Sequence, residues 1–165
     1  MRVLATLLAT VALPLLPVAA MASGAGAHDH GKHEHGTSTS GEAGDPARVT
    51  RTVTIKMSEY AFDTQTLTFR AGETVKFVVI NNGKLKHELT VGTAEEQKAH
   101  RAAMQSMSDM NHDEHSHDMP ANAIHVNPGE TREFVWHFTK AGSLQFACNY
   151  PGHADLGMEG KISVK

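Results

Sequence analysis

Near its C-terminus the chain reads Cys148-Asn-Tyr-Pro-Gly-His153-Ala-Asp-Leu-Gly-Met158, which places a thiol, an imidazole and a thioether at five-residue steps. These three groups are typical ligands of a mononuclear site in which one cysteine and two histidines bind the metal and a methionine lies at a longer, axial distance. Such a site needs a second histidine, and His87 is available far upstream. The stretch therefore predicts one metal site built from His87, Cys148, His153 and Met158.

The alternation of side chains along the predicted strands tests whether these residues point the same way. Positions i, i+2 and i+4 of a strand share one face. Cys148 is in phase with two apolar residues of the predicted strand that it ends. His87 is in phase with two of the strand that it begins, and Met158 with those of the strand that follows it. His153 lies on the intervening loop. A single buried cysteine or methionine more often only fills a core, but the four residues together favour a metal site.

Short β-type segments separated by Gly, Pro and Asn turns recur along the rest of the chain. We expect strands at residues 52–57, 66–70, 74–80, 87–91, 123–126, 131–138, 144–148 and 159–164. Thr93-Ala-Glu-Glu96 has the pattern of a capping box, which predicts a helix that ends near residue 107. Because no βαβ alternation is present, the pattern indicates an all-β sandwich or barrel with one short helix and a Met/His-rich loop insertion at residues 109–122.

The N-terminal residues have the pattern of an export signal. Arg2 precedes an apolar run that ends in small residues, with Ala20-Met-Ala22 as the expected cleavage site and Ala25-Gly-Ala27 as an alternative. The apolar run is too short for a membrane-spanning helix. We expect a signal peptide at residues 1–22, a periplasmic location and no membrane insertion after cleavage; an uncleaved membrane anchor is the alternative.

Composition divides the remaining chain into a tail and one domain. Residues 23–49 are rich in Gly, Ser, Thr, Ala and His and predict a disordered His-rich tail, whereas residues 50–165 carry the strands. The net charge of −3 gives no basic patch, so nucleic acid is not an expected partner. The one cysteine cannot form an intramolecular disulfide, and a free thiol in an oxidising compartment favours a ligand role.

The two segments of the predicted site resemble the cupredoxin (type 1 copper protein) family. The motifs that carry the resemblance are Asn81-Asn-Gly-Lys-Leu-Lys-His87-Glu-Leu89 and Cys148-x4-His153-x4-Met158, and the likeness spans residues 50–165. It implies a Greek-key β-sandwich with one type 1 copper, as Cu(I) or Cu(II), bound by His87, Cys148 and His153 with Met158 axial. Many family members have Asn or Ser where this chain has Glu88, so the resemblance leaves the hydrogen bonding around the cysteine sulfur open.

The segments outside this core resemble the periplasmic copper-tolerance cupredoxins of the CopI type. Thioethers select Cu(I) and imidazoles bind Cu(II), so we predict that a His-rich tail and a Met/His-rich segment bind additional copper ions. For the tail, a merely polar linker is the alternative, and for Met104 and Met107, one helical turn apart, it is core packing. The predicted accessory ligands are His28, His30, His33, His35, Met104, Met107, Met110, His112, His115, His117, Met119 and His125.

The surplus of copper-binding groups favours one function over two others. A protein that only transfers electrons needs one copper, whereas this chain carries three segments suited to copper. We therefore expect copper capture, buffering or hand-over in copper tolerance. The alternative is a single-copper electron-transfer carrier between redox partners. An enzyme such as a copper oxidase needs further copper ligands across domains or subunits, so we expect no enzymatic activity, and we expect copper ions and a redox or copper-transfer protein as partners.

Overall fold

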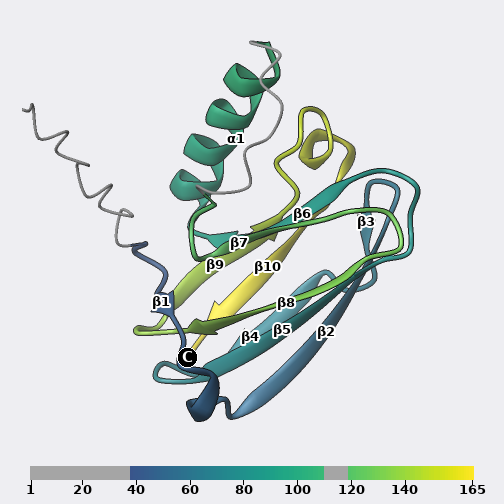
Figure 1. Ribbon diagram of the computed structural model, residues 1–165. Coiled ribbons are helices and arrows are strands. Elements are labelled where there is room, and N and C mark those ends of the chain that lie inside the picture. The colour runs from purple at the N-terminus through teal and green to yellow at the C-terminus, as the bar shows by residue number, and fades with distance from the viewer. Residues whose placement is uncertain (1–37, 110–118) are drawn as a thin grey trace, which may run out of the picture. The chain divides into compact units, whose positions relative to one another are not determined.

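The computed structural model of the protein describes residues 38–109 and 119–165, in which two five-stranded sheets form a β-sandwich (Figure 1). One sheet has the order β1 (Glu42–Ala43), β8 (Thr131–His137), β5 (Thr74–Asn81), β2 (Arg51–Ser58) and β3 (Ala61–Phe62). The other has the order β4 (Thr66–Phe69), β10 (Glu159–Val164), β9 (Gly142–Ala147), β6 (His87–Gly92) and β7 (Ala123–Val126). The β2–β5 and β4–β10 pairs are parallel and the other pairs are antiparallel.

The core lies between the two sheets and follows from the alternation of apolar residues. In β10 every second residue is buried, as expected for a strand with one face toward a core. Gly160 on this strand leaves room for the ring of Phe146 on β9, because a Cβ at Gly160 would lie 2.1 Å from the Cζ atom of that ring. Phe146 also packs edge to face on Phe62 of β3, with ring centroids 5.1 Å apart. This ring therefore packs β9 against β10 in its own sheet and against β3 in the other.

One helix, α1 (Ala94–Asp109), connects to β6 and covers the outer face of that strand (Figure 1). The predicted capping box is present: the amide of Thr93 donates to Glu96 Oε2 at 2.7 Å, and the amide of Glu96 donates to Thr93 Oγ1 at 3.2 Å. All six residues of β6 are buried, including Glu88 and Thr90, which alternate with the apolar residues of the strand. The helix explains this burial, because Gln97 and His100 on α1 contact the outward-facing side of β6.

The predicted all-β sandwich with a helix is confirmed, and each predicted strand is present within one or two residues of its expected ends. Four short elements were not predicted: β1, β3 and the 3-10 helices η1 (Pro46–Arg48) and η2 (Ala154–Leu156). The expectation of disorder to residue 49 is wrong for residues 38–49, because β1 pairs with β8 and Ser40 is buried. The predicted signal peptide, the predicted tail up to residue 37 and residues 110–118 lie outside the described residues.

Candidate metal centre

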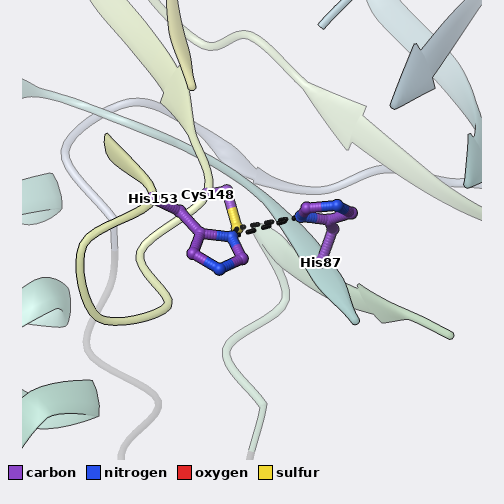
Figure 2. Close-up of side chains that lie close together, drawn as sticks. All are labelled: His87, Cys148 and His153. Atoms are coloured by element: carbon purple, nitrogen blue, oxygen red, sulfur yellow. Dashed lines mark hydrogen bonds between the residues drawn. The ribbon is translucent and has the colours of Figure 1, made fainter. Parts of the chain in front are cut away.

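Two strands of the second sheet and one loop bring His87, Cys148 and His153 together (Figure 2). His87 is the first residue of β6, Cys148 directly follows β9, and His153 lies on the loop before β10. The two Nδ1 atoms of the histidines are 3.2 Å apart, and the sulfur of Cys148 lies 3.4 Å from Nδ1 of His153 and 3.9 Å from Nδ1 of His87. Two imidazole nitrogens and one sulfur therefore face a common point.

Asn81 stabilises the turn that leads from β5 to His87. This residue ends β5 and is fully buried. Its Nδ2 donates to the carbonyl oxygens of Leu85, at 2.7 Å, and of Val126, at 3.0 Å, and its Oδ1 accepts from the amide of Gly83 at 2.9 Å. The side chain thus takes the place of backbone partners in a loop that has left the sheet, which fixes the start of β6 and its first side chain.

The loop from Cys148 to Met158 is closed on itself by backbone hydrogen bonds. The amide of Cys148 donates to the carbonyl of Met158, and the amide of Met158 donates to the carbonyl of His153, each at 3.1 Å. Gly152 and Gly157 have φ angles of +82° and +98°, the left-handed region that glycine adopts at little cost. Two glycines therefore allow the tight path that returns His153 over Cys148.

Met158 directly precedes β10 and has no exposed surface. Its side chain belongs to the same buried cluster as that of Cys148. The inward phase that the sequence predicted for Met158 is therefore confirmed, and its backbone is hydrogen-bonded to both Cys148 and His153. The backbone of the same loop therefore fixes the place of Met158 relative to Cys148 and His153.

Burial keeps the three donor groups uncharged in the protein chain alone. Burial raises the pKa of the Cys148 thiol to about 12. It also lowers the pKa of His87, with a further contribution from the nearby His153, and it lowers the pKa of His153 itself. Neutral imidazoles are the form that binds metals, and a bound metal removes the proton of a coordinating thiol. Burial thus leaves two neutral imidazoles that can bind a metal, and a thiol that loses its proton when a metal binds.

The distances between the donors fit a small cation in a trigonal arrangement. With bonds of about 2.0 Å to nitrogen and 2.3 Å to sulfur, as at zinc sites, a planar trigonal site places the two nitrogens about 3.5 Å apart and each nitrogen about 3.7 Å from sulfur. The observed separations are 3.2 Å between the nitrogens and 3.4 and 3.9 Å to sulfur. The residues present therefore fit a His2Cys metal site.

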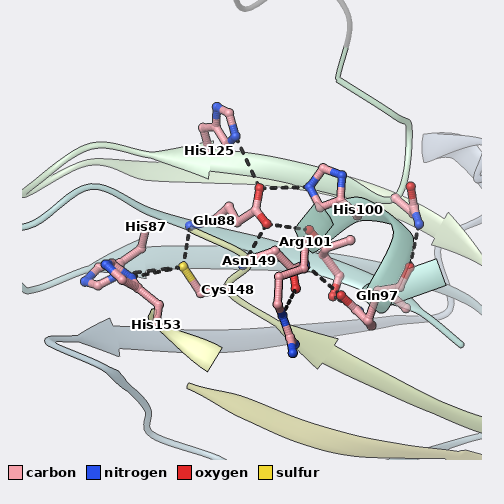
Figure 3. A network of polar contacts seen from close by, with 12 residues as sticks. His87, Glu88, Gln97, His100, Arg101, His125, Cys148, Asn149 and His153 are labelled. Carbon is pink, nitrogen blue, oxygen red and sulfur yellow. Dashed lines mark hydrogen bonds and ion pairs between the residues drawn. The ribbon is translucent and has the colours of Figure 1, made fainter. Parts of the chain in front are cut away.

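A network behind the cysteine was not predicted from the sequence (Figure 3). The amide of Glu88 is a hydrogen-bond donor 3.4 Å from the sulfur of Cys148. A backbone amide therefore supplies the hydrogen bond to this sulfur, which the resemblance to the cupredoxins left open. The carboxylate of Glu88 is buried and contacts His100 on α1 and His125 on β7, each at 3.2 Å. His100 was not assigned a role, although its position three residues after Gln97 on one helical face was a usable signal.

The predicted accessory ligands divide between described residues and the rest of the chain. Met104 is buried on α1 and Met107 is 43% exposed, so the two do not share one environment. Met119 is half-buried, and His125 lies against Glu88. The other eight predicted accessory ligands lie outside the described residues: His28, His30, His33, His35, Met110, His112, His115 and His117.

In the described ranges, no helix is long and apolar enough to cross a membrane.

Comparisons with known proteins agree with this geometry. Residues 49–165 match the model of the family described as copper binding proteins, plastocyanin/azurin family. The copper-resistant cuproprotein CopI of Rubrivivax gelatinosus is 44% identical over 142 residues, which cover 86% of this chain and 80% of that protein. CopI of Pseudomonas aeruginosa is 35% identical over 149 residues, covering 76% of this chain and 82% of that protein.

A solved structure, that of auracyanin B, has the same fold. It superimposes with a TM-score of 0.62 at 21% identity and covers 76% of this chain and 96% of that chain. The family match spans all strands but β1, and its residues include the three facing donor groups. The chain therefore belongs to the plastocyanin/azurin family of copper-binding proteins, the cupredoxins, and is a cupredoxin of the CopI type.

Proposed function

We propose that this protein is an exported, non-enzymatic copper-binding protein that captures and buffers copper and so protects the cell from copper excess. The observation that carries the proposal is the approach of Nδ1 of His87, Nδ1 of His153 and Sγ of Cys148 to within 4.8 Å of one another. A copper held there supplies one-electron redox chemistry between Cu(I) and Cu(II). The proposed ligands are His87, Cys148 and His153, with Met158 axial.

The residues of the site would hold copper with one thiolate and two neutral imidazoles. Cys148 would bind as thiolate, and the amide of Glu88 lies 3.4 Å from its sulfur. His87 and Cys148 have no exposed surface, so these two ligands are shielded from competing water. Since His87 and the loop carrying His153 are both fixed by backbone hydrogen bonds, the protein would hold these donors in one arrangement for either copper oxidation state.

The proposal of copper protection is supported by the relatives and by the ligand surplus. Two relatives that align with more than three quarters of this chain are named copper-resistant cuproproteins. The tail and the segment after α1 carry further histidines and methionines. Thioether and imidazole groups together bind both copper oxidation states, which suits capture better than electron transfer alone.

A single-copper electron carrier is the second candidate, and a surface feature favours it. Leu156 is 63% exposed and Leu85 is 39% exposed, and each lies within three residues of a proposed ligand, His153 and His87 respectively. Exposed apolar residues beside a partly exposed ligand are suited to docking a redox partner. Copper buffering and electron transfer make different demands on stoichiometry, so one experiment separates them.

The test is a copper titration of the protein after signal removal, with metal analysis and copper-sensitivity assays of cells that lack the gene. The proposal predicts more than one tightly held copper per chain, with the excess lost when residues 23–37 or 104–119 are removed, and increased copper sensitivity of the deletion strain. One copper per chain, fast electron exchange with a cytochrome and unchanged copper sensitivity would establish the carrier instead.

A further inference from the structure

The hairpin between β2 and β3 carries an unusual residue beside the metal centre. Ser58 pairs with Ala61, so Glu59 and Tyr60 form a two-residue loop. Tyr60 has a φ angle of 59°, and it is the one non-glycine residue in the described ranges with a positive φ. This left-handed region is usual for glycine or asparagine in turns and is disfavoured for a bulky side chain. A tyrosine at this position therefore points to a role beyond forming the turn.

The ring of Tyr60 lies against one of the proposed copper ligands. It meets the imidazole of His153 edge to face, with ring centroids 5.0 Å apart and an angle of 84° between the planes. Tyr150, on the same loop as His153, contacts this imidazole as well, with centroids 5.8 Å apart. Edge-to-face packing is a favoured geometry for aromatic pairs. The contact with Tyr60 therefore favours the orientation of the His153 ring in which its Nδ1 faces the other two donors.

The loop of this hairpin is anchored to the segment that leads to the other histidine. The side chain of Glu59 accepts the amide N–H of Lys84, which lies between β5 and His87. The two residues of the loop thus contact the segments that carry both histidine ligands. Because its neighbour is held in this way, Tyr60 is fixed at its backbone while its ring contacts His153.

His153 is the donor through which solvent reaches the site. Among the three facing donor residues, His87 and Cys148 have no exposed surface, whereas His153 is partly exposed. A metal ion or another small solute that enters from solvent therefore passes beside the His153 ring, and this ring must move to admit it. The edge contact with Tyr60 opposes that movement, because it has to be broken first.

We infer that Tyr60 is a positioning residue that holds the His153 ring over the site and slows the exchange of copper with solvent. This inference rests on the copper site proposed above and adds to it the residue that controls access. A barrier of this kind acts in both directions, so it slows binding and release by the same factor and leaves the equilibrium affinity almost unchanged. A side chain that only stabilises the loaded site would change release alone.

Tyr60→Gly tests the inference, because glycine removes the ring and suits the positive φ of the turn. The first readout needs no metal: it is the rate at which iodoacetamide alkylates Cys148, the one cysteine, in the copper-free protein. The other two are the rates of Cu(II) binding and of Cu(II) release to EDTA, followed by the thiolate-to-Cu(II) absorption band. We expect all three rates to rise about three- to tenfold, the factor that corresponds to one lost aromatic contact. The affinity for Cu(II) should change by less than about twofold.

Tyr60→Phe is the matched control, because it keeps the ring and the backbone preference and loses only the hydroxyl. We expect its three rates to stay within about twofold of the native values. Unchanged rates in Tyr60→Gly, faster release without faster binding, or equal changes in both variants would overturn the inference. If thermal unfolding shows that Tyr60→Gly does not fold, Tyr60→Asn decides the question, since asparagine also tolerates this φ. A native protein without the thiolate-to-Cu(II) band refutes the proposed copper site itself, and the alkylation rates of the copper-free protein still test the role of Tyr60.

Discussion

Gln97 anchors α1 to the metal centre, and replacing it by methionine tests that connection. The side chain is 1% exposed. Its Nε2 donates to the carbonyl oxygens of Thr90, at 2.8 Å, and Gln145, at 3.2 Å, and its Oε1 accepts from Nδ2 of Asn149 at 2.8 Å. Methionine keeps the length and the helix propensity of glutamine but offers none of these hydrogen bonds, so Gln97→Met leaves three polar groups without their partner.

The size of the effect follows from burial. Each buried polar group left unsatisfied costs about 1–3 kcal/mol, and Asn149 has no exposed surface. Burying a more apolar side chain offsets about 1 kcal/mol of this cost. We expect Gln97→Met to lower the free energy of unfolding by about 3 kcal/mol, which lowers Tm by about 10 °C for a domain of this size. Because Asn149 follows Cys148, the copper affinity should fall as well.

Urea and thermal unfolding of the copper-free protein measure this prediction, followed by copper competition. The matched control is Lys98→Met, which makes the same change at the next residue of α1, where the side chain is exposed. We expect that control to alter the unfolding free energy by less than about 0.5 kcal/mol. A loss below about 1 kcal/mol for Gln97→Met, or equal losses for the two variants, would refute the anchoring role of this glutamine.

Two further predictions concern packing and pH. Gly160→Ala should destabilise the protein by about 2–3 kcal/mol in thermal unfolding, because the added Cβ would lie 2.1 Å from a ring carbon; Gly142→Ala, with open space around it, should not, and equal effects would contradict the packing argument. The pKa values of His87 and His153 are lowered by burial, so below about pH 6.5 the unfolded chain binds more protons and the copper-free protein loses stability. Urea midpoints that do not fall between pH 7.5 and 5.5 would speak against this.

Strand periodicity predicted most of the sandwich and the direction of three site residues. It succeeded because β5 and β10 bury apolar side chains at every second position, which is a local property of the sequence. The short strands β1 and β3 have two residues each, too few for any alternation. β1 is stabilised by pairing with the distant β8, and β3 by a tight hairpin with the preceding β2, contributions that periodicity does not include.

The polar network around Glu88 could not be predicted from the sequence for a related reason. Alternation places Glu88 on the face of its strand opposite His87 and Leu89, and α1 places His100 against the carboxylate on that face. A helix docked on a strand creates burial from long-range packing, which local patterns do not report. The four-residue copper motif, in contrast, was recognisable because three of its members lie within eleven consecutive residues.

In the proposed site, Cys148 binds copper as thiolate together with His87 and His153. The most direct measurement is the visible absorption spectrum of the Cu(II)-loaded protein after signal removal, compared with that of Cys148→Ser. We predict an intense thiolate-to-Cu(II) charge-transfer band in the native protein and its complete loss in the variant, because an alcohol at this position offers no such transition. A native protein without that band, or an intense band that survives in Cys148→Ser, would contradict the account.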